Sequence, residues 1–554
     1  MFQMLEGATP YSEQDAARYL SEGWWRGLTL SDWLDRAADE HPDRVAFIDL
    51  QSRLTYDEAR DRSVRLAVAL LKLGLKPLDR VLIQLPNWNE VAPIYFALQR
   101  IGAIPVMLID RYREHEIEKL ATLSGASAWF VPMRFRKTDY VPIIEQVLGQ
   151  VPAIKTVITV RGENEAGRFP YLDRLIDETE PTPADLKQLA ALRPDPMQVA
   201  HMGPTGGSTG TPKIVPRTHN SIGASAEYCS QAWTLAPGDT NMIVGSIGHD
   251  LSFTKGFLGS VITMCPLVLL DATDPESICE TIQREKVTAV VWVPTLAQRL
   301  LEYECLDQYD LTTLKKMHSA GAAASPGLIE QVVDRLGATF FNGYGGTEGM
   351  TTITGPDDDL RTVTSTVGRP SCPGDTYKVV DFSGKTLPPG ESGELLLKGA
   401  GVFTGYYRND EENAKAFDVN GFFKTGDVAR ISENRYVTIT GRIKEMINRG
   451  GESISATVIE KLIERHPKVA AVAVVAMPDP VMGERVCAYV EPKTGCELSF
   501  ETVIEFLRDE KASVLELPER IEFIEQMPVT PAQKNDKNAL RRDIETKLAA
   551  EKKN

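Results

Sequence analysis

The residues best suited to chemistry lie in one short loop. It reads Thr205-Gly206-Gly207-Ser208-Thr209-Gly210-Thr211-Pro212-Lys213, with three glycines, four hydroxyl side chains and one lysine. Glycines let the backbone approach a polyphosphate, hydroxyls donate hydrogen bonds to its oxygens, and the lysine adds positive charge. The spacing is not that of a Walker A loop, because proline precedes the lysine and isoleucine follows it. The stretch predicts a phosphate-binding loop of another kind; the plain alternative is a flexible Gly/Ser loop.

The elements around this loop alternate between helices and buried strands. Thr55 followed by Glu58 predicts a capping box in front of an apolar-faced helix. Residues 81–85 and 104–108 are apolar runs typical of strands, with a helix expected over 90–101 between them. The apolar run 261–270 is expected to be another buried strand. This alternation indicates an α/β fold with a largely parallel sheet.

The pattern changes towards the C-terminus. From about residue 362, strands become short and Gly, Pro and Asp turns are frequent, which predicts a small β-rich, barrel-like subdomain over about 362–443. Residues 444–554 read as a separate α+β unit with helices near 456–464 and 500–508 and strands near 469–477 and 486–490. We therefore predict an N-terminal core over 1–443 and a C-terminal domain over 444–554.

Composition and charge narrow the function classes. The chain has 554 residues and a net charge of −16, which makes nucleic acid and anionic membrane surfaces poor partners. Its seven cysteines include no C-x-x-C pair, so reduced thiols are expected rather than disulfides or a zinc site. The N-terminus lacks the basic and apolar segments of a signal peptide, and no apolar stretch approaches the roughly 20 residues of a membrane span. A cytoplasmic protein is expected.

The motifs, taken in order, resemble those of the adenylate-forming superfamily, which contains acyl-CoA synthetases, peptide-synthetase adenylation domains and luciferases. The resemblance covers nearly the whole chain. The phosphate loop resembles the signature of the whole superfamily. Its extension Pro216-Arg217-Thr218-His219-Asn220 and the N-terminal Gly23-Trp24-Trp25-Arg26-Gly27-Leu28-Thr29-Leu30 resemble the 2,3-dihydroxybenzoate–AMP ligase branch in particular. The resemblance implies a ligase that uses ATP and Mg²⁺ to form an acyl adenylate and then transfers the acyl group to a thiol.

The resemblance also assigns nucleotide-binding roles to residues. Those expected to hold the phosphates are Thr205, Gly206, Gly207, Ser208, Thr209, Gly210 and Lys213. Those expected along the adenine are Gly321, Ala322, Ala323 and the aromatic Tyr344. In Asn342-Gly343-Tyr344-Gly345-Gly346-Thr347-Glu348, Thr347 is expected to contact the α-phosphate and Glu348 to bind Mg²⁺, which needs few protein ligands beside phosphate oxygens. Asp427 is expected on the ribose hydroxyls, and Arg442 is expected to add a contact to the ribose or the phosphate.

The C-terminal motifs carry the remaining expectations. Lys534, in Pro531-Ala532-Gln533-Lys534, takes the position of the catalytic lysine, although many relatives have glycine where Gln533 stands and Lys537 is a second candidate. Lys444 takes the position of the hinge about which the small domain turns between the two half-reactions. That rotation would bring Arg449 and Gly450 to the pantetheine arm of the thiol substrate.

The acyl pocket is expected at Gly248-His249-Asp250-Leu251-Ser252-Phe253-Thr254-Lys255. His249 matches a position beside the substrate carboxylate, with a buried core histidine as the alternative. Asp250 departs from the dihydroxybenzoate branch, which usually has asparagine there. It either holds a substrate amine or pairs with Lys255. Phe253, with Phe257, Trp292 and Val293, either forms an apolar wall for an aromatic or alicyclic acid or belongs to the core.

The acceptor thiol remains open between coenzyme A and the pantetheine arm of a carrier protein. No carrier attachment segment follows Lys534, and the pocket departures remove the main reason to expect a siderophore acid, so coenzyme A is favoured. A luciferase-like oxidation of the adenylate is the alternative from another class and would keep every motif. A non-catalytic binding protein is disfavoured because Lys534, Glu348 and Asp427 are all present.

Overall fold

The computed structural model describes residues 4–162, 168–205, 212–449, 452–530 and 535–551. The chain divides into two compact units. Unit 1 comprises Met1–Ala324, Leu328–Thr376 and Lys398–Phe423, and unit 2 comprises Ser325–Gly327, Tyr377–Leu397 and Lys424–Asn554. The domain boundary predicted between residues 443 and 444 remains a prediction.

Unit 1 is built on two sheets. The larger has the order β17-β16-β15-β14-β13-β11-β12-β1-β2 and is parallel from β15 to β1, with antiparallel strands at both edges. Its strands are β1 (Val45–Ile48), β2 (Arg53–Thr55), β11 (Asn241–Ile243), β12 (Leu267–Leu269), β13 (Ala289–Trp292), β14 (Lys316–Ser319), β15 (Thr339–Gly345), β16 (Thr351–Ile353) and β17 (Arg369–Pro370).

The second sheet of unit 1 has the order β10-β9-β4-β3-β5-β8 and is parallel except for the β9/β10 hairpin. Its strands are β3 (Arg80–Ile83), β4 (Ile104–Met107), β5 (Ala126–Pro132), β8 (Thr156–Val160), β9 (Val199–Pro204) and β10 (Ile214–Thr218). Alternate side chains of each strand enter different cores: Val81 and Ile83 of β3 point to one, and Leu82 points to the other.

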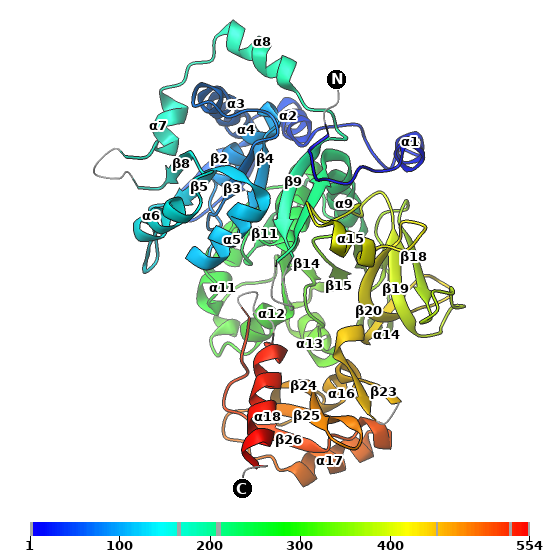
Figure 1. Cartoon of the computed structure of the whole chain (residues 1–554). Helices are drawn as coiled ribbons and strands as arrows, with labels where there is room; N and C mark the ends of the chain where they lie inside the picture. Colours follow the sequence, from blue (N-terminus) through cyan, green and yellow to red (C-terminus); the bar gives the residue numbers. More distant parts are fainter. Residues whose placement is uncertain (1–3, 163–167, 206–211, 450–451, 531–534, 552–554) are drawn as a thin grey trace. The chain divides into compact units, whose positions relative to one another are not determined.

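Helices complete a five-layer α/β/α/β/α arrangement in unit 1 (Figure 1). The central core between the two sheets contains α2 (Leu30–Glu40), α3 (Tyr56–Lys72), α4 (Val91–Ile101) and α9 (His219–Ala232). The outer cores contain α5 (Glu114–Ser124) and α6 (Val141–Gln150) on the six-stranded sheet, and α11 (Pro275–Glu285) and α12 (Pro294–Leu301) on the nine-stranded sheet. Shorter helices are α1 (Glu13–Ser21), α7 (Leu172–Asp177), α8 (Pro183–Leu192), α14 (Leu360–Ser365) and α15 (Asp410–Ala416).

The predicted α/β fold class is confirmed, and several local predictions with it. Thr55 and Glu58 form the expected capping box at the start of α3. One local prediction is wrong: the apolar run 261–270 is not one strand. It begins inside the helix α10 (Gly259–Thr263), which ends where Met264 takes a left-handed backbone conformation, and only β12 is extended. Apolar character alone does not distinguish a buried helix from a buried strand.

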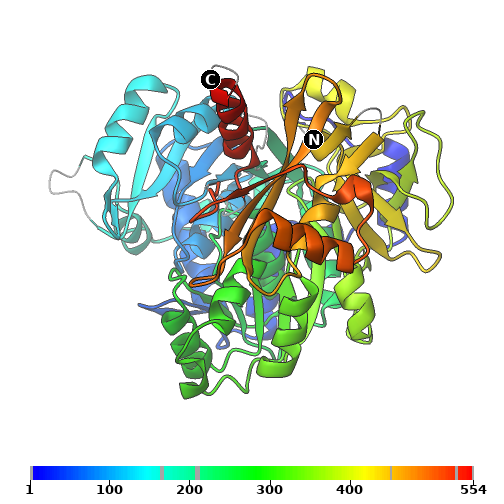
Figure 2. The same cartoon turned by 90° about the horizontal axis from the view of Figure 1, so that it is seen from below.

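Unit 2 contains two further sheets. The first is four-stranded in chain order, with β18 (Thr376–Val380), β19 (Gly393–Lys398), β20 (Phe423–Ile431) and β21 (Val437–Arg442). The second contains β22 (Met446–Arg449), β23 (Glu452–Ser455), β24 (Val469–Asp479), β25 (Gly483–Pro492) and β26 (Arg520–Phe523). One face of this second sheet packs on α16 (Ala456–Ile463) and α17 (Phe500–Asp509), and the other on α18 (Lys537–Glu551), as Figure 2 shows from below.

Candidate active site

The β9/β10 hairpin fixes the two ends of the predicted phosphate loop. The backbone N–H of Thr205 donates to the carbonyl oxygen of Lys213 at 2.8 Å, and the N–H of Lys213 donates to the hydroxyl of Thr205 at 3.2 Å. Residues 206–211, which carry the other predicted phosphate contacts, lie outside the described residues. The hairpin therefore fixes the backbone of Lys213 directly before β10.

Lys213 belongs to a chain of polar contacts that ends on Glu348. Its Nζ lies 2.7 Å from Oε2 of Glu412 on α15 and 4.4 Å from the centroid of the Tyr406 ring. The hydroxyl of Tyr406 donates to Oε1 of Glu348 at 2.9 Å. Burial raises the pKa of Glu348, while the bond from Tyr406 and the charge of Lys213 oppose that rise. Tyr406 thus contacts both predicted residues: its ring faces the phosphate lysine Lys213, and its hydroxyl binds the magnesium ligand Glu348.

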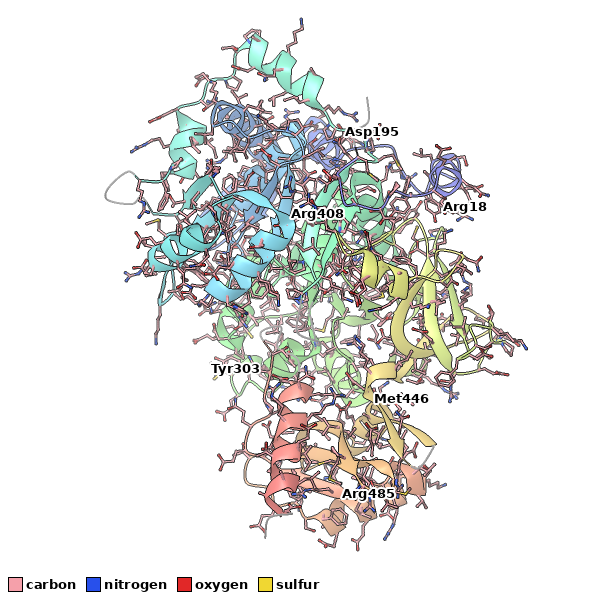
Figure 3. The ribbon with its side chains drawn as sticks, in the orientation of Figure 1. Arg18, Asp195, Tyr303, Arg408, Met446 and Arg485 are labelled. Carbon is pink, nitrogen blue, oxygen red and sulfur yellow. The ribbon has the colours of Figure 1, made fainter. Side chains whose placement is uncertain are left out.

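Sequence reasoning missed Tyr406 and Glu412. The available signal was the Gly405-Tyr406 pair before Asn409, whose side chain caps α15 and so sets the direction of Glu412. Arg408, which is labelled in Figure 3, lies in this segment between Tyr406 and Asn409. Nothing in that local pattern points to Lys213 or Glu348, which are distant in the chain.

A buried arginine supports the loop that carries Thr347. The Arg217 guanidinium donates to the carbonyl oxygens of Thr347 at 3.2 Å and Gly401 at 2.6 Å. The N–H of Gly401 donates in turn to Oδ1 of Asp375 at 3.1 Å. Burial raises the pKa of Asp375 to about 7, although Gly401 and Arg217 act in the opposite direction. Arg217 and Asp375 were also missed as supporting residues, although the sequence analysis quoted Arg217 within a motif.

The predicted adenine strip follows β14. Gly321 has a positive φ of 85°, and a Cβ there would lie 3.5 Å from Val293 and 3.9 Å from Leu251. Ala322 and Ala323 are exposed, so a planar ligand would meet only small side chains along this segment. Tyr344, at the end of β15, is half-buried.

The predicted acyl segment forms a π-helix, η1 (Leu251–Leu258), preceded by the half-buried His249 and Asp250. Oδ1 of Asp250 accepts from the hydroxyl of Thr254 at 2.7 Å. Nζ of Lys255 donates instead to the hydroxyls of Ser225 and Thr351, each at 2.7 Å. The structure therefore does not contain the direct Asp250–Lys255 pair that was one of the two expectations for Asp250.

The four aromatic and apolar residues of the predicted wall take different places. Phe253 and Phe257 lie in the central core, where Phe253 stacks on His201 with ring centroids 4.7 Å apart. Trp292 lies in the core on the other side of the nine-stranded sheet, and Val293 packs against that core while approaching Gly321. Of the four, Val293 is the one that the structure places beside the predicted nucleotide strip.

Unit 2 carries the predicted ribose residues. Asp427 on β20 pairs in register with Arg442 on β21, and Nε of Arg442 lies 2.9 Å from Oδ1 of Asp427. Asp427 is buried and its N–H donates to the hydroxyl of Thr425 at 3.0 Å. The structure brings these two residues together, and their contacts to a ribose stay a prediction. Arg449 forms an ion pair with Glu519 at 2.6 Å. Gly450 lies outside the described residues.

The structure describes one of the two candidate catalytic lysines near the C-terminus, Lys537. Lys534 lies outside the described residues. Lys537 is largely buried at the start of α18, with Nζ 2.6 Å from Glu445 and 2.8 Å from Glu460. The charges of these two carboxylates raise the pKa of Lys537 against the effect of burial. Because its ammonium already forms ion pairs with two carboxylates, Lys537 stabilises the fold of unit 2, which argues against it as the catalytic lysine.

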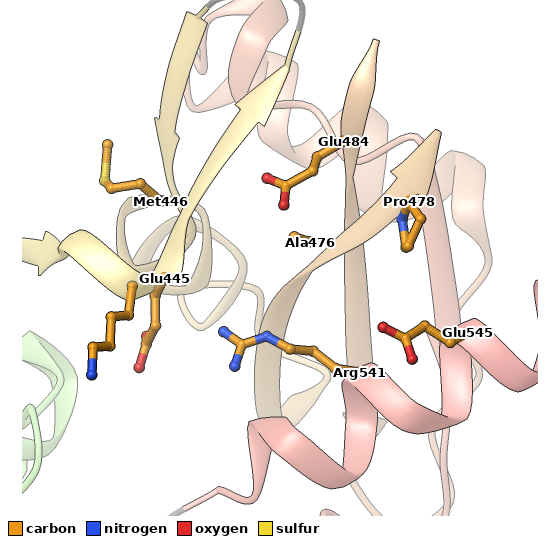
Figure 4. A pocket seen from close by; sticks show the side chains of 8 residues that line it. Glu445, Met446, Ala476, Pro478, Glu484, Arg541 and Glu545 are labelled. Atoms are coloured by element: carbon orange, nitrogen blue, oxygen red, sulfur yellow. The ribbon is translucent and has the colours of Figure 1, made fainter. Parts of the chain in front are cut away.

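A cavity of about 150 Å³ lies next to the predicted hinge in unit 2. Figure 4 shows Arg541 and Glu545 of α18 and Glu484 of β25 at its wall, and Met446, also labelled in Figure 3, follows Glu445 on the other side. Lys444 lies in the short 3₁₀ turn Ile443–Glu445 and also lines it. The wall carries charges of both signs.

Glu348 suits a magnesium ion that retains other oxygen ligands. It offers a half-buried carboxylate oriented by Tyr406, and the described residues contain no group of three or more His, Cys, Asp or Glu side chains able to enclose a metal. Mg²⁺ is usually bound by one or two carboxylates together with waters and substrate phosphates. The donor set therefore fits the expected ion.

The chain belongs to the AMP-binding enzyme family. The family model matches residues 34–407, and the model of the AMP-binding enzyme C-terminal domain matches residues 458–534. The predicted membership of the adenylate-forming superfamily, in its aryl-acid branch, is confirmed, and the chain is an AMP-forming ligase. Among the described residues, no helix combines the length and apolar character needed to cross a membrane.

Particular relatives span the whole chain. It is 34% identical over 552 residues to the 2,3-dihydroxybenzoate-AMP ligase of Bacillus subtilis, covering 99% of both chains. It is 35% identical over 540 residues to the salicylyl-CoA synthase / salicylate adenylyltransferase of a Streptomyces species, covering 97% of both. The apo structure of MbtA from Mycobacterium smegmatis superposes with a TM-score of 0.73 at 30% identity, over 98% of this chain and 100% of that one.

Proposed function

We propose that this enzyme adenylates an aromatic or alicyclic carboxylic acid with ATP and transfers the acyl group to coenzyme A, with release of pyrophosphate and AMP. The observation that carries the first step is the contact chain from Lys213 through Tyr406 to Glu348, beside Thr347. It supplies a cation for phosphates and an oriented carboxylate for a metal. These are the two requirements for bringing an anionic acid to an anionic nucleotide.

In the first half-reaction, an oxygen of the substrate carboxylate attacks the α-phosphorus and pyrophosphate leaves. Lys213 binds the β- and γ-phosphates and exchanges Glu412 for them, while Thr347 contacts the α-phosphate. When bound at Glu348, Mg²⁺ supplies positive charge against the phosphates. Lys534 takes the place beside both the carboxylate and the α-phosphate, where it offsets the charge that develops in the transition state.

In the second half-reaction, the thiol sulfur attacks the acyl carbonyl carbon and AMP leaves with the bond electrons. The small domain turns about Lys444, which withdraws Lys534 and presents Arg449 and Gly450 to the pantetheine arm. A short turn that absorbs the backbone change is typical of such hinges, and Lys444 lies in one.

Coenzyme A as acceptor is supported by one relative that is named a salicylyl-CoA synthase and by the acyl segment. Asp250 is engaged by Thr254, so the environment of this position differs from the asparagine expected for a dihydroxybenzoate site. The second candidate is transfer to the pantetheine arm of a carrier protein, as a dihydroxybenzoate–AMP ligase-like enzyme would perform. Oxidation of the adenylate is the third and predicts oxygen consumption.

The test uses purified protein with ATP, Mg²⁺ and a panel of benzoates, cyclohexane carboxylates and short fatty acids, with and without coenzyme A. AMP, pyrophosphate and acyl-CoA are measured together. Lys534→Ala should lower adenylation by about 10²–10³-fold, the usual effect of removing one transition-state charge partner. Lys468→Ala, which removes an exposed lysine of the same unit, is the matched control.

Acyl-CoA formed in equal amount to AMP would support the proposal. Acid-dependent pyrophosphate exchange without acyl-CoA would retain adenylation and move the acceptor to a carrier protein. Tight ATP binding with no acid-dependent exchange across the panel would contradict the adenylation step.

A further inference from the structure

One face of the nine-stranded sheet carries buried polar side chains opposite η1. His318 on β14 pairs with Phe341, whose ring lies in the core between the two sheets, and the same face continues through Gly343 to Thr351. A Cβ at Gly343 would lie only 2.8 Å from Nε2 of His318, so the glycine leaves this imidazole uncovered by a side chain on β15. Lys255, on η1, contacts the same face because its ammonium donates to the hydroxyl of Thr351.

Lys255 is only partly satisfied in this position. It is 4% exposed, and its ammonium donates two of its three N–H bonds to the hydroxyls of Ser225 and Thr351. Its third N–H has no partner among the described residues, and none of their carboxylates forms an ion pair with it. Asp250 accepts from Thr254 and Asp375 accepts from a backbone N–H, so neither neutralises the lysine by direct contact.

His318 is also incompletely satisfied. It is 1% exposed, and its Nδ1 has no hydrogen-bond partner among the described residues. Burial, with a smaller contribution from the charge of Lys255, lowers the pKa of His318 to about 3, so the ring is neutral. A neutral imidazole has one N–H to donate.

Within the described part of the chain, an unpaired ammonium N–H and an unpaired imidazole nitrogen at one buried face are costly to the fold. A buried polar group without its partner costs about 1–3 kcal/mol and a charged one more. Replacing this lysine by an apolar side chain of similar length would remove the cost of a buried charge without an ion-pair partner among the described residues, and would remove its hydrogen bonds to Ser225 and Thr351. Groups that weaken the fold in this way are typical of binding sites, where the ligand supplies the missing acceptor.

We propose that Lys255 and His318 bind a second carboxylate of the substrate acid, so that the preferred substrates are ring-containing dicarboxylic acids. The inference rests on the proposed function, because it names the class of acid that is adenylated. A carboxylate has two oxygens and about four acceptor sites, enough to take an N–H from the ammonium and one from the imidazole. The hydroxyl of Thr351 holds Lys255 in place for this contact.

The test compares matched acids in the full chain: benzoate with isophthalate, and cyclohexanecarboxylate with cyclohexane-1,3-dicarboxylate. Acid-dependent pyrophosphate exchange gives kcat/KM for each, and thermal shift with ATP and each acid gives a binding readout without turnover. The wild type should prefer each diacid over its monoacid. In Lys255→Met that preference should fall by about 10- to 100-fold, the usual effect of removing a charge-assisted hydrogen bond.

Stability separates a binding role from a structural one. Lys255→Met should change the midpoint of thermal unfolding little, because the loss of a buried charge offsets the loss of two hydrogen bonds, and the exposed Lys72→Met should change neither stability nor preference. His318→Phe should lower the diacid preference. Equal loss with all four acids together with a lower unfolding midpoint would overturn the inference, as would a wild type that prefers the monoacids. Absence of exchange with any acid would instead contradict the proposed function.

Discussion

Replacing Tyr406 by phenylalanine removes one hydrogen bond and almost nothing else. The lost bond runs from the Tyr406 hydroxyl to Oε1 of Glu348 at 2.9 Å, and the ring that faces Lys213 remains. Hydrogen bonds to charged groups contribute about 1.5–3 kcal/mol, and each 1.4 kcal/mol corresponds to about tenfold in an equilibrium constant. If Glu348 holds the metal, the change should weaken Mg²⁺ binding by about 10- to 100-fold. Loss of a residue that orients a metal ligand usually has an effect of that size.

The assay is the initial rate of pyrophosphate exchange as a function of free Mg²⁺ at saturating ATP and acid. We expect the half-saturating Mg²⁺ concentration to rise while the rate at saturating Mg²⁺ falls by only a few-fold. Binding of Mn²⁺, followed by electron paramagnetic resonance with a non-hydrolysable ATP analogue, should weaken in parallel. Tyr407→Phe is the matched control, because its buried hydroxyl has no partner among the described residues. Unchanged Mg²⁺ dependence in Tyr406→Phe, or an equal change in both variants, would refute the reasoning.

Three further predictions concern stability and the hinge. Lys537→Met leaves the half-buried Glu445 and Glu460 without their shared cation and should lower the free energy of unfolding by about 1–3 kcal/mol in denaturant titrations. An unchanged midpoint would show that the cluster is not needed. Burial lowers the pKa of His219 to about 3, so as the pH falls below about 6.5 the unfolded chain binds this proton before the folded chain does. The free energy of unfolding therefore falls by about 1.4 kcal/mol per pH unit. His219→Asn should make the pH dependence of stability shallower by this amount between about pH 6 and 4, and parallel curves for the two proteins would contradict the prediction. Lys444→Pro should retain adenylation and lose thioester formation, measured by pyrophosphate exchange and acyl-CoA, and equal loss of both would contradict the hinge.

Local signals in the sequence predicted the elements well, because their causes lie within a few residues. The capping box of Thr55 and Glu58 needs only its own turn, and the alternation of helices and strands predicted the parallel sheets. The run 261–270 was mispredicted since its apolar residues are buried in both a helix and a strand. Three residues, Met264–Pro266, separate the helix from the strand, and the helix ends where Met264 takes a left-handed backbone conformation.

The candidate site was predictable where a motif carries it, and not where distant segments meet. The motifs named Asp427 and Arg442 one by one, and the structure adds that they pair across neighbouring strands. Glu412, by contrast, contacts Lys213 across 199 positions of the chain, and no spacing rule connects them. The resemblance to a family supplied the residues expected to touch the nucleotide, and the tertiary structure supplied those that hold them in place.

The ion pairs of Lys537 have a consequence for the hinge. Glu445 directly follows Lys444, and Lys537 begins the helix that follows the predicted lysine loop, so one ammonium connects the segment after the hinge with the segment after Lys534. Glu460 on α16 joins the same cluster. Since leaving partly buried charges unpaired costs about 1–3 kcal/mol, these ion pairs hold the described parts of the segments together during a rotation. A turn about Lys444 would therefore move Glu445, Glu460 of α16 and the start of α18 together.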